Sequence, residues 1–526
     1  MIKKIKIQNY KIFKDIELDV HKQKNIIVGE NGVGKSTILE AVSIVLNGSK
    51  SIIDSIGIQS MFNKDVIKCF FENEKSIENL PTVNIEIYFD LPDNPMYECL
   101  YGKNNLLNIN SFGIYMIIKP DLDLYSAEIG SILSLEEDIF PYEYYKLQFK
   151  TFANTIYDSY SKKHKFRYEF IDSSKLNSKI GIKKFVSNLF DQHANEQQKN
   201  NIRFQFRKQL NDFSGRLYED FDLEHSGDFI IQTSNLVTSQ FDNHITAIKD
   251  DISIEQEGKG EQLILGIQSS LNSTHENVAI VLIEEPENHL SHLNMLKLLG
   301  LIEKSNMQLF ISTHSNMIAS RLELNNMHII SKYSVMSIND ISSHANKFFK
   351  KSPNTNLLDY ILSKKVILVE GPAEYILLNN FYEKLQSSLP QNNEISIISV
   401  NGLNFKNYLE IAEKIGVNTL VITDNDRDYH NNIIEKYEQY NTFDNIKIVS
   451  DNNNDNSTFE VCLYNLNKDI LEENFKTSRM NKGLLNYMLS NKTDFAINLL
   501  EKLENKQIEI EIPEYIKEGI QWIKEK

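Results

Sequence analysis

Cysteine is scarce in this sequence, and its few copies are scattered. The 526 residues include three cysteines, Cys69, Cys99 and Cys462, and none of their spacings matches a pair of zinc ligands. This pattern argues against a disulfide framework and against a zinc site, and it fits a reducing compartment. Long apolar runs are also missing: stretches such as 278–283 hold only a handful of residues, while a membrane span needs roughly 18. We therefore expect a cytoplasmic protein with no membrane segment.

Positive charge is in short supply as well. Lysine and arginine number 56 against 72 aspartates and glutamates, which gives a formal net charge of -16. Phosphate binding relies on lysine and arginine, so the deficit argues against a protein that coats DNA. It does not exclude an enzyme that meets DNA at a local basic groove, because bound metal ions can reverse the local field. The length suggests about three folding units.

A phosphate-binding loop stands near the start of the chain. GENGVGKST, residues 29–37, lies between an expected strand at 25–28 and an expected helix from Lys35 to about Leu46, which is the context that this motif requires. Glycines let backbone N–H groups approach the phosphates, Lys35 reaches the outer phosphates and Ser36 can hold Mg²⁺. The residues that we expect to line a nucleotide here are Gly29, Asn31, Gly32, Gly34, Lys35, Ser36 and Thr37.

A second nucleotide motif follows much later in the chain. VAIVLIEEPENHL reads as an apolar strand that ends in two acids, so we predict that Glu284 binds Mg²⁺ and that Glu285 polarises the attacking water. His314 follows the next expected strand, 309–311. Taken alone, the two acids could form a solvated loop and His314 an ordinary core or surface histidine; their order after a phosphate-binding loop favours the nucleotide site.

Four carboxylates form a second candidate centre. VILVEGPAE puts Glu370 at the end of an apolar strand and Glu374 in the first turn of the next helix, and VITDND puts Asp424 and Asp426 at the end of another strand. Ligands of open α/β sheets bind at that edge. Acids so close together repel one another unless divalent cations bind, so the cluster predicts Mg²⁺ or Mn²⁺ and two-metal phosphodiester cleavage.

Both centres resemble known domains. The order of the nucleotide motifs is similar to that of ABC ATPases, in which the histidine senses the γ-phosphate. That resemblance implies that Gly258, Gly260 and Gln262, in GKGEQ where the family has LSGGQ, contact ATP held by an opposing head. The E-G-x-x-E and D-x-D motifs resemble the TOPRIM domain of topoisomerases, primases and certain nucleases. We therefore expect an α/β chain with an ABC-type P-loop ATPase head, which contains a helical insertion, followed by a TOPRIM α/β domain.

Joined in one chain, these domains resemble the OLD (overcoming lysogenization defect) nucleases, the group that includes the nuclease subunit of the Gabija antiphage system. The resemblance implies an ATPase domain over 1–345 with a dimerising insertion around 128–250, and a TOPRIM domain over 360–526 with a helical extension. It also implies Glu460 as a further metal ligand and Lys492, or alternatively Lys482, as the lysine that stabilises charge on the phosphate.

The resemblance predicts an ATP-regulated, metal-dependent DNA endonuclease of bacterial defence against phage. Its expected cofactors are ATP and Mg²⁺, with Mn²⁺ or Ca²⁺ as alternatives in the TOPRIM site. Its expected partners are DNA, a second or further copy of the chain, and a helicase-type protein. One alternative makes the head an SMC-like ATPase or nucleotide sensor and the TOPRIM domain a platform for a partner; a topoisomerase or primase ranks last. Whether ATP activates or inhibits cleavage stays open.

Overall fold

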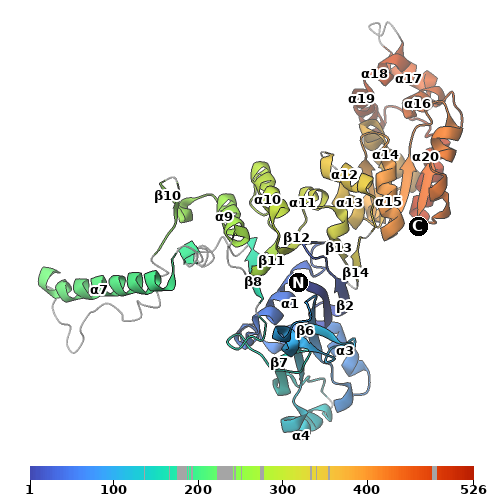
Figure 1. The fold of residues 1–526 in the computed structure, drawn as a ribbon. Coiled ribbons are helices and arrows are strands. Elements are labelled where there is room, and N and C mark those ends of the chain that lie inside the picture. Colours follow the sequence, from blue (N-terminus) through green and yellow to red (C-terminus); the bar gives the residue numbers. More distant parts are fainter. Residues whose placement is uncertain are drawn as a thin grey trace. The chain divides into compact units, whose positions relative to one another are not determined.

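The chain divides into two compact units in the computed structural model (Figure 1). The first comprises Met1–Ile27, Asn31–His314 and Ile330–Val335, and the second comprises Val28–Glu30, Ser315–Ile329 and Met336–Lys526. The structure describes every residue except 136, 165, 174–185, 188, 191–193, 222–240, 242–244, 250, 273–277, 332–333, 339, 353–355 and 477–482. Within the described residues, no helix combines the length and the apolar character that a membrane crossing needs.

An antiparallel sheet opens the first unit. Its strands run in the order β2-β1-β4-β6-β5, and β7 also pairs with β6. Every residue of β4 is buried: α1 (Lys35–Asn47) packs on one side of the strand, and on the other side the N–H of Leu106, in the loop after β5, donates a hydrogen bond to Glu86. The strands are β1 (Ile2–Tyr10), β2 (Phe13–Asp19), β4 (Val83–Phe89), β5 (Tyr101–Gly102), β6 (Ser111–Pro120) and β7 (Tyr145–Thr151).

Parallel strands carry the nucleotide motifs. β3 (Lys24–Val28), β12 (Gln308–Ser312), β11 (Val278–Glu284) and β8 (Arg167–Asp172) are neighbours in that order. All five residues of β12 are buried, as expected for parallel strands that are covered on both faces. Because neighbouring parallel strands end at the same edge, the residues that follow β11 and β12 meet there. The remaining elements of this part of the chain are α1 (Lys35–Asn47), α2 (Lys50–Ile56), α3 (Lys64–Glu72), α4 (Leu122–Leu133), α7 (Glu196–Phe221), β9 (Ile248–Lys249), β10 (Ile252–Ser253), α9 (Lys259–Asn272) and α10 (His292–Lys304).

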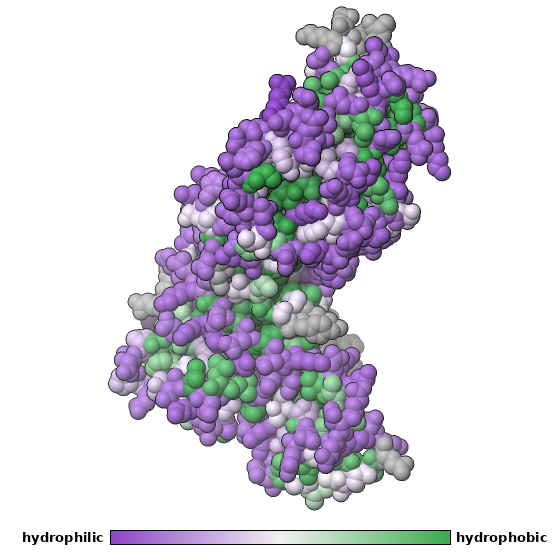
Figure 2. All heavy atoms as spheres, turned by 90° about the vertical axis from the view of Figure 1, so that its right-hand side faces the viewer, coloured by the Kyte–Doolittle hydropathy of each residue, from purple (hydrophilic) through white to green (hydrophobic). Residues whose placement is uncertain are grey.

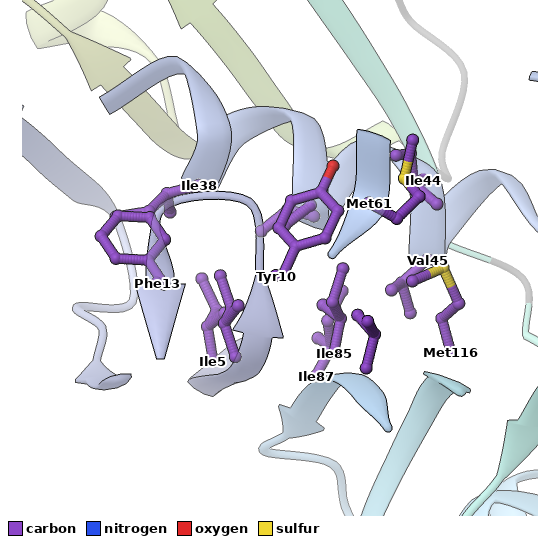
Figure 3. Packing of buried hydrophobic residues seen from close by; sticks show 14 of the residues in the cluster. Ile5, Tyr10, Phe13, Ile38, Ile44, Val45, Met61, Ile85, Ile87 and Met116 are labelled. Carbon is purple, nitrogen blue, oxygen red and sulfur yellow. The ribbon is translucent and has the colours of Figure 1, made fainter. Parts of the chain in front are cut away.

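A continuous apolar core fixes α1 against the antiparallel sheet (Figure 3). Ile38 and Val45 of α1 pack with Tyr10, Phe13 and strand residues such as Ile85, and all of these side chains are fully buried. Each such side chain contributes roughly 1.5–3 kcal/mol of transfer free energy. The start of α1, and with it the phosphate-binding loop, is therefore held by the core of the unit.

The region 128–250 differs from the helical insertion that the sequence suggested. It contains strand β7 of the antiparallel sheet and strand β8, which pairs in parallel with β11 over Ile283↔Ile171 and its neighbours. The early part of the region therefore belongs to the ATPase sheets rather than to an insertion. The long helix α7 follows, and much of the rest lies outside the described residues, so the dimerising role stays a prediction.

The second unit is built on a four-stranded parallel sheet in the order β16-β15-β17-β18. β15 and β17 each carry four consecutive buried residues, which is the apolar pattern that predicted them. The sheet and its helices are β15 (Lys365–Val369), α14 (Pro372–Gln386), β16 (Ile395–Ser399), α15 (Phe405–Ile415), β17 (Asn418–Ile422), β18 (Ile446–Val449), α16 (Phe459–Leu466), α17 (Lys468–Phe475), α18 (Leu484–Ser490), α19 (Lys492–Glu504) and α20 (Glu514–Glu525). The helical C-terminal extension packs into the same core as the sheet.

The second unit also takes in residues that the sequence assigned to the ATPase domain. They form α11 (Asn316–Arg321), β13 (Met327–Ile330), β14 (Val335–Ser337), α12 (Ser343–Lys351) and α13 (Leu357–Leu362). Asn316 Oδ1 accepts a hydrogen bond from the backbone of Leu358 at 2.6 Å, and Ser342 donates to Glu410. By contacts, the main change from one unit to the other comes after His314 rather than between 345 and 360. Hydrophilic side chains cover most of the face drawn in Figure 2, with smaller apolar areas between them.

Candidate nucleotide and metal sites

Two glycines of the phosphate-binding loop have left-handed backbones. Gly32 has φ 78° and Gly34, the N-cap of α1, has φ 104°. A Cβ atom on Gly34 would lie 2.4 Å from Ile12 Cδ1 and 2.6 Å from Phe13 Cζ, whereas one on Gly32 would meet open space. Gly34 is therefore required both by conformation and by close packing. Gly32 leaves room beside the loop for a bound group.

Lys35 begins α1 and is buried, with 5% of its surface exposed. Burial lowers the pKa of its ammonium, and Glu285, Glu287 and Glu284 act in the opposite direction. The predicted lysine and both predicted acids of the second motif thus lie within electrostatic range of one another. Gly29 is buried, Thr37 is half-buried, and Asn31 and Ser36 are exposed.

Glu285 and His314 approach each other at the ends of β11 and β12. The backbone N–H of Glu285 donates to Ser312 O at 3.0 Å, and Asn288 Nδ2 donates to Glu285 Oε2 at 3.0 Å. His314 Nε2 lies 3.6 Å from Glu285 Oε1. Burial, and then Lys35, lower the pKa of His314, while Glu285 opposes them. The lowered pKa favours the neutral imidazole, which is placed beside the acid predicted to orient water.

Glu287 is a positioning residue that the sequence analysis did not single out. Its Oε1 accepts hydrogen bonds from Thr313 Oγ1 at 2.8 Å and from the backbone N–H of His314 at 2.5 Å. Burial raises the pKa of Glu287, and these hydrogen bonds oppose the rise. The available signal was its place three residues after the end of β11, facing the end of the neighbouring strand. Glu287 fixes the loop that carries His314.

The predicted signature residues lie at the start of α9. A Cβ on Gly260 would lie 2.8 Å from His289 O, so this glycine lets α9 approach the loop after β11. Gln262 is buried and donates from Nε2 to Ile254 O at 2.8 Å and to Glu257 O at 3.0 Å. The amide of Gln262 thus holds the preceding turn. Its predicted contact with a nucleotide on a second head stays a prediction, as does that of Gly258 and Gly260.

The carboxylates of the second unit gather at the carboxyl edge of its sheet. β15 and β17 are parallel neighbours with Val369 opposite Ile422, so Glu370 and Asp424 follow adjacent strand ends. Glu374 lies in the first turn of α14, and only 6% of its surface is exposed. A Cβ on Gly371 would lie 3.2 Å from Glu374 Oε2. The short turn thus holds both glutamates of E-G-x-x-E close to one another.

Glu460 and Lys492, which the sequence placed only by resemblance, join this cluster. The backbone N–H of Phe459 donates to Asp424 Oδ1 at 2.8 Å, and Glu460 follows at 2% exposure. Lys492 begins α19, and its Nζ lies 2.9 Å from Glu460 Oε2. The alternative lysine, Lys482, lies outside the described residues.

Asn425, between the two aspartates of D-x-D, was also missed. It is buried and donates from Nδ2 to Asp451 O at 2.8 Å and to Asn453 O at 2.9 Å. This anchors the loop, so that Asp426 stays exposed, with φ 49° and its N–H bonded to Ser457 O at 3.1 Å. The sequence signal was an amide residue set between two acids.

Burial and mutual repulsion raise the pKa values of the cluster. Burial, followed by Glu370, Glu374 and Glu460, raises the pKa of Asp424 to about 8. Burial raises the pKa of Glu374 to about 7, with a further contribution from Glu460. Burial and Asp426 raise the pKa of Glu370. For Lys492, burial favours a lower pKa, but the hydrogen bond and charge of Glu460 outweigh it and the pKa is raised. The site is short of positive charge.

The residues present fit divalent cations. The donors are carboxylate oxygens, which Mg²⁺, Mn²⁺ and Ca²⁺ prefer. Within the described chain, Glu370 Oε2 and Glu460 Oε1 are buried without a hydrogen-bond partner, a costly arrangement unless an ion or water satisfies them. Among those same residues, no three His, Cys, Asp or Glu side chains are already close enough together to hold a metal ion, so the fit rests on the chemistry of the donors.

Comparisons with known proteins agree with both centres. Residues 1–255 match the model of an AAA ATPase domain, and residues 361–426 match the TOPRIM domain of overcoming lysogenization defect protein-like proteins. The fold and the two sites thus define a protein with an ATPase domain followed by a TOPRIM domain. Within this class the matched TOPRIM model is that of overcoming lysogenization defect protein-like proteins, which agrees with the resemblance to the OLD family seen in the motifs.

Individual relatives are distant but cover most of the chain. Endonuclease GajA of Bacillus cereus (strain VD045) is 24% identical over 460 residues, 80% of this chain and 74% of that protein. The retron Vc95 probable ATPase of Vibrio cholerae serotype O1 biovar El Tor is 23% identical over 384 residues, 63% of this chain and 73% of that protein. Among solved structures, an Smc head bound to the C-winged helix domain of ScpA aligns at 17% identity with a TM-score of 0.35, over 64% of this chain and 98% of that one, a level too low to carry an argument.

Proposed function

We propose that this chain is an ATP-controlled, divalent-metal-dependent DNA endonuclease that acts in defence against phage. The observation that carries the proposal is the cluster at the carboxyl edge of β15 and β17. There, Glu374 and Asp424, whose pKa values are raised toward neutrality, lie close to other carboxylates and to Lys492. The similarity to Endonuclease GajA supports nuclease activity, and the similarity to a retron ATPase supports its link to an ATPase.

The cluster supplies the groups that phosphodiester cleavage needs. Five carboxylates would hold the cations: Glu370, Glu374, Asp424, Asp426 and Glu460. Bound divalent cations would supply charge neutralisation and an activated water. The chain's own part is to fix these oxygens, through the turn at Gly371 and the hydrogen bond from Phe459 to Asp424. Lys492, 2.9 Å from Glu460, is the group that would offset charge gained by the phosphate in the transition state.

The nucleotide site would control access to this cluster. Gly29, Asn31, Gly32, Gly34, Lys35, Ser36 and Thr37 would hold the phosphates, with Glu284 on the Mg²⁺ side. Glu285 would orient water and His314 would sense the γ-phosphate. Gly258, Gly260 and Gln262 would contact ATP on a second copy, which makes a homodimer or larger assembly part of the proposal, together with a helicase-type partner and a cytoplasmic location. ATP would either activate cleavage or hold it off until nucleotide is depleted.

The test is cleavage of supercoiled plasmid by the purified full chain with Mg²⁺ or Mn²⁺, with and without ATP. We compare the wild type with Glu370→Ala, Lys35→Ala and the matched control Glu394→Ala. Glu394 is an exposed acid that immediately precedes β16, so it lies at the edge of the sheet opposite to the carboxylate cluster. It pairs with Lys364.

We expect nicking or linearisation that EDTA and Glu370→Ala abolish and that Glu394→Ala leaves intact. The cleavage rate of Lys35→Ala with ATP then shows whether bound ATP activates or inhibits cleavage. A wild type that cuts no DNA in any of these conditions would remove the nuclease and favour the sensor alternative. Plasmid relaxation with resealing would instead indicate a topoisomerase.

A further inference from the structure

Two lysines outside the motifs lie beside the carboxylate cluster. Lys406 is the second residue of α15 and is exposed, and Lys436 follows the π-helix η9 (His430–Glu435) and is half-buried. A π-helix is rare and often marks a functional site. Neither lysine belongs to a predicted motif, and the proposed cleavage chemistry does not use them.

The sheet order brings both lysines to the same edge. β15 lies between β16 and β17, so the segment after β16, which leads to Lys406, and the segment after β17, which leads to Lys436, flank the end of β15. The backbone N–H of Gly402 donates to Glu370 O at 2.9 Å, which fastens the first segment to the cluster. Tyr440 OH donates to Lys406 O at 3.5 Å, which joins the second segment to the first.

Tyr437 locates Lys436 more closely. The ammonium of Lys436 lies 5.2 Å from the centre of the Tyr437 ring. Tyr437 is buried and near enough to Glu370 that this carboxylate, after burial, raises the pKa of its phenol. Lys436 therefore sits over a ring that itself borders Glu370.

The two ammonium groups also affect each other. Burial and then Lys406 lower the pKa of Lys436, while Asp426 and Glu370 oppose them. Lys492 offsets part of the negative charge of the cluster through a direct ion pair with Glu460. In the part of the chain that the structure describes, Lys406 and Lys436 form no such ion pair. Two like charges kept near each other, neither of them in an ion pair within the described residues, favour an anion beside them, and a phosphodiester that approaches the cluster is an anion of suitable chemistry.

We propose that Lys406 and Lys436 form a phosphate-binding pair that holds the DNA strand next to the scissile phosphate. The inference rests on the proposed nuclease function and adds residues that position its substrate. Lysine presents a point charge without a fixed hydrogen-bonding fork, so the pair contacts the backbone and reads no base sequence. It provides local positive charge in a chain whose net charge is -16.

The test is steady-state DNA cleavage by the full chain over a series of salt concentrations. We compare the wild type, the double variant Lys406→Gln/Lys436→Gln, the double variant Lys406→Arg/Lys436→Arg, and the matched control Lys414→Gln. Lys414 lies near the other end of α15, is exposed, and pairs with Glu413 at 3.4 Å. Melting temperatures show that all four proteins are folded.

The glutamine pair should raise KM about tenfold with kcat within about twofold. It should also lower the slope of log kcat/KM against log salt by about 1 per lysine. The arginine pair should keep the wild-type slope because it keeps the charge, and Lys414→Gln should match the wild type.

Different results distinguish a failure of the phosphate-binding pair from a failure of the proposed nuclease function. A glutamine pair with the wild-type KM and slope overturns the phosphate-binding pair while the nuclease stands. So does a loss in kcat alone, or an arginine pair that behaves like the glutamine pair. A wild type that cuts no DNA overturns the proposed function and this inference together.

Discussion

The nucleotide site and the carboxylate cluster are both built at the carboxyl edge of parallel strands, yet they differ in the number of acids that each gathers and in the groups that surround those acids. At the nucleotide site Glu285 accepts from Asn288, and Glu287 Oε1 accepts from Thr313 and the backbone of His314, while Glu287 Oε2 is buried without a hydrogen-bond partner. In the described part of the cluster, Glu370 Oε2 and Glu460 Oε1 are buried without a hydrogen-bond partner.

The groups present at each edge indicate which ligand suits the nucleotide site and which suits the carboxylate cluster. The first site has left-handed glycines, a helix N-terminus and Lys35, all suited to an anion, and its acids are already held in place. The second site has acids whose pKa values reach about 7 and 8 for Glu374 and Asp424, so it is suited to cations. One edge is prepared for phosphate directly, while the other needs cations before phosphate can approach.

The comparison predicts that the two centres can be broken separately. Asp424→Asn should lower DNA cleavage by more than about 100-fold, because losing even the outer-shell support of a metal site costs 10- to 100-fold. ATP hydrolysis should stay within about twofold of the wild type, since Asp424 belongs to the second centre. Both rates are measured on the same preparation.

Asp444→Asn is the control for this change, because it alters an exposed aspartate of the same unit that precedes β18. A variant Asp424→Asn that cleaves at the wild-type rate would show that the cluster is not the cutting site. A parallel collapse of ATP hydrolysis would show that the centres are not separable.

The second prediction concerns the prearranged acids of the nucleotide site. Glu287→Ala removes the acceptor for Thr313 Oγ1 and His314 N, and hydrogen bonds to a charged group are worth about 1.5–3 kcal/mol each. We expect ATP turnover to fall about ten- to 100-fold while the affinity for ATP changes little, because His314 loses its position and Lys35 does not. Hydrolysis rates and binding of a fluorescent ATP analogue test this.

The ATP turnover of Glu287→Gln should lie between that of the wild type and that of Glu287→Ala, since the amide oxygen of glutamine can still accept one of the hydrogen bonds. An alanine variant that turns over ATP normally would show that Glu287 has no positioning role.

The third prediction is a stability effect within the cluster. Lys492→Met leaves Glu460, at 3% side-chain exposure, without its partner. Breaking a fully buried pair costs about 3–5 kcal/mol; here we expect about 1–2 kcal/mol, because the side chain of Lys492 is 45% exposed and water screens part of the interaction. Urea unfolding in EDTA measures the loss.

Glu460→Gln added to Lys492→Met should recover most of that stability, because it removes the uncompensated charge. Mg²⁺ should also stabilise Lys492→Met more than the wild type. Additive effects of the two substitutions would contradict a direct pair.

Much of the fold and of the candidate site could be predicted from strand and turn patterns in the sequence. Apolar runs that end in acids predicted β11, β15 and β17, and the spacing of Glu370, Glu374, Asp424 and Asp426 predicted a shared edge. Glu460 and Lys492 could be placed only by resemblance, because the side chains that meet at that edge come from helices far along the chain.

Other features gave little local signal. β8 pairs with β11 across more than a hundred residues, and nothing near Arg167–Asp172 announces that partner. Glu287 and Asn425 act through hydrogen bonds to backbone that the fold alone brings close. Sequence reasoning therefore found the groups that carry the chemistry more readily than the groups that hold them.

The smallest predicted effect is a pH dependence that only the cluster should show. The folded pKa values of Asp424 and Glu374, about 8 and about 7, lie above their ordinary values of 3.8 and 4.5. The native metal-free protein therefore holds protons that the unfolded chain releases, so these groups make stability fall as pH rises from about 4 to about 8. Mg²⁺ replaces those protons, so its stabilising effect should grow over the same window. We expect the melting temperature in EDTA to fall by a few degrees more for the wild type than for Asp424→Asn between about pH 5 and pH 8, and Mg²⁺ to raise it most at the upper end. Since groups outside the cluster titrate equally in both proteins, the difference between them isolates the cluster. A difference that is flat, or that grows in the opposite direction, would mean that Asp424 is charged in the metal-free protein and that the contrast between the two edges is wrong.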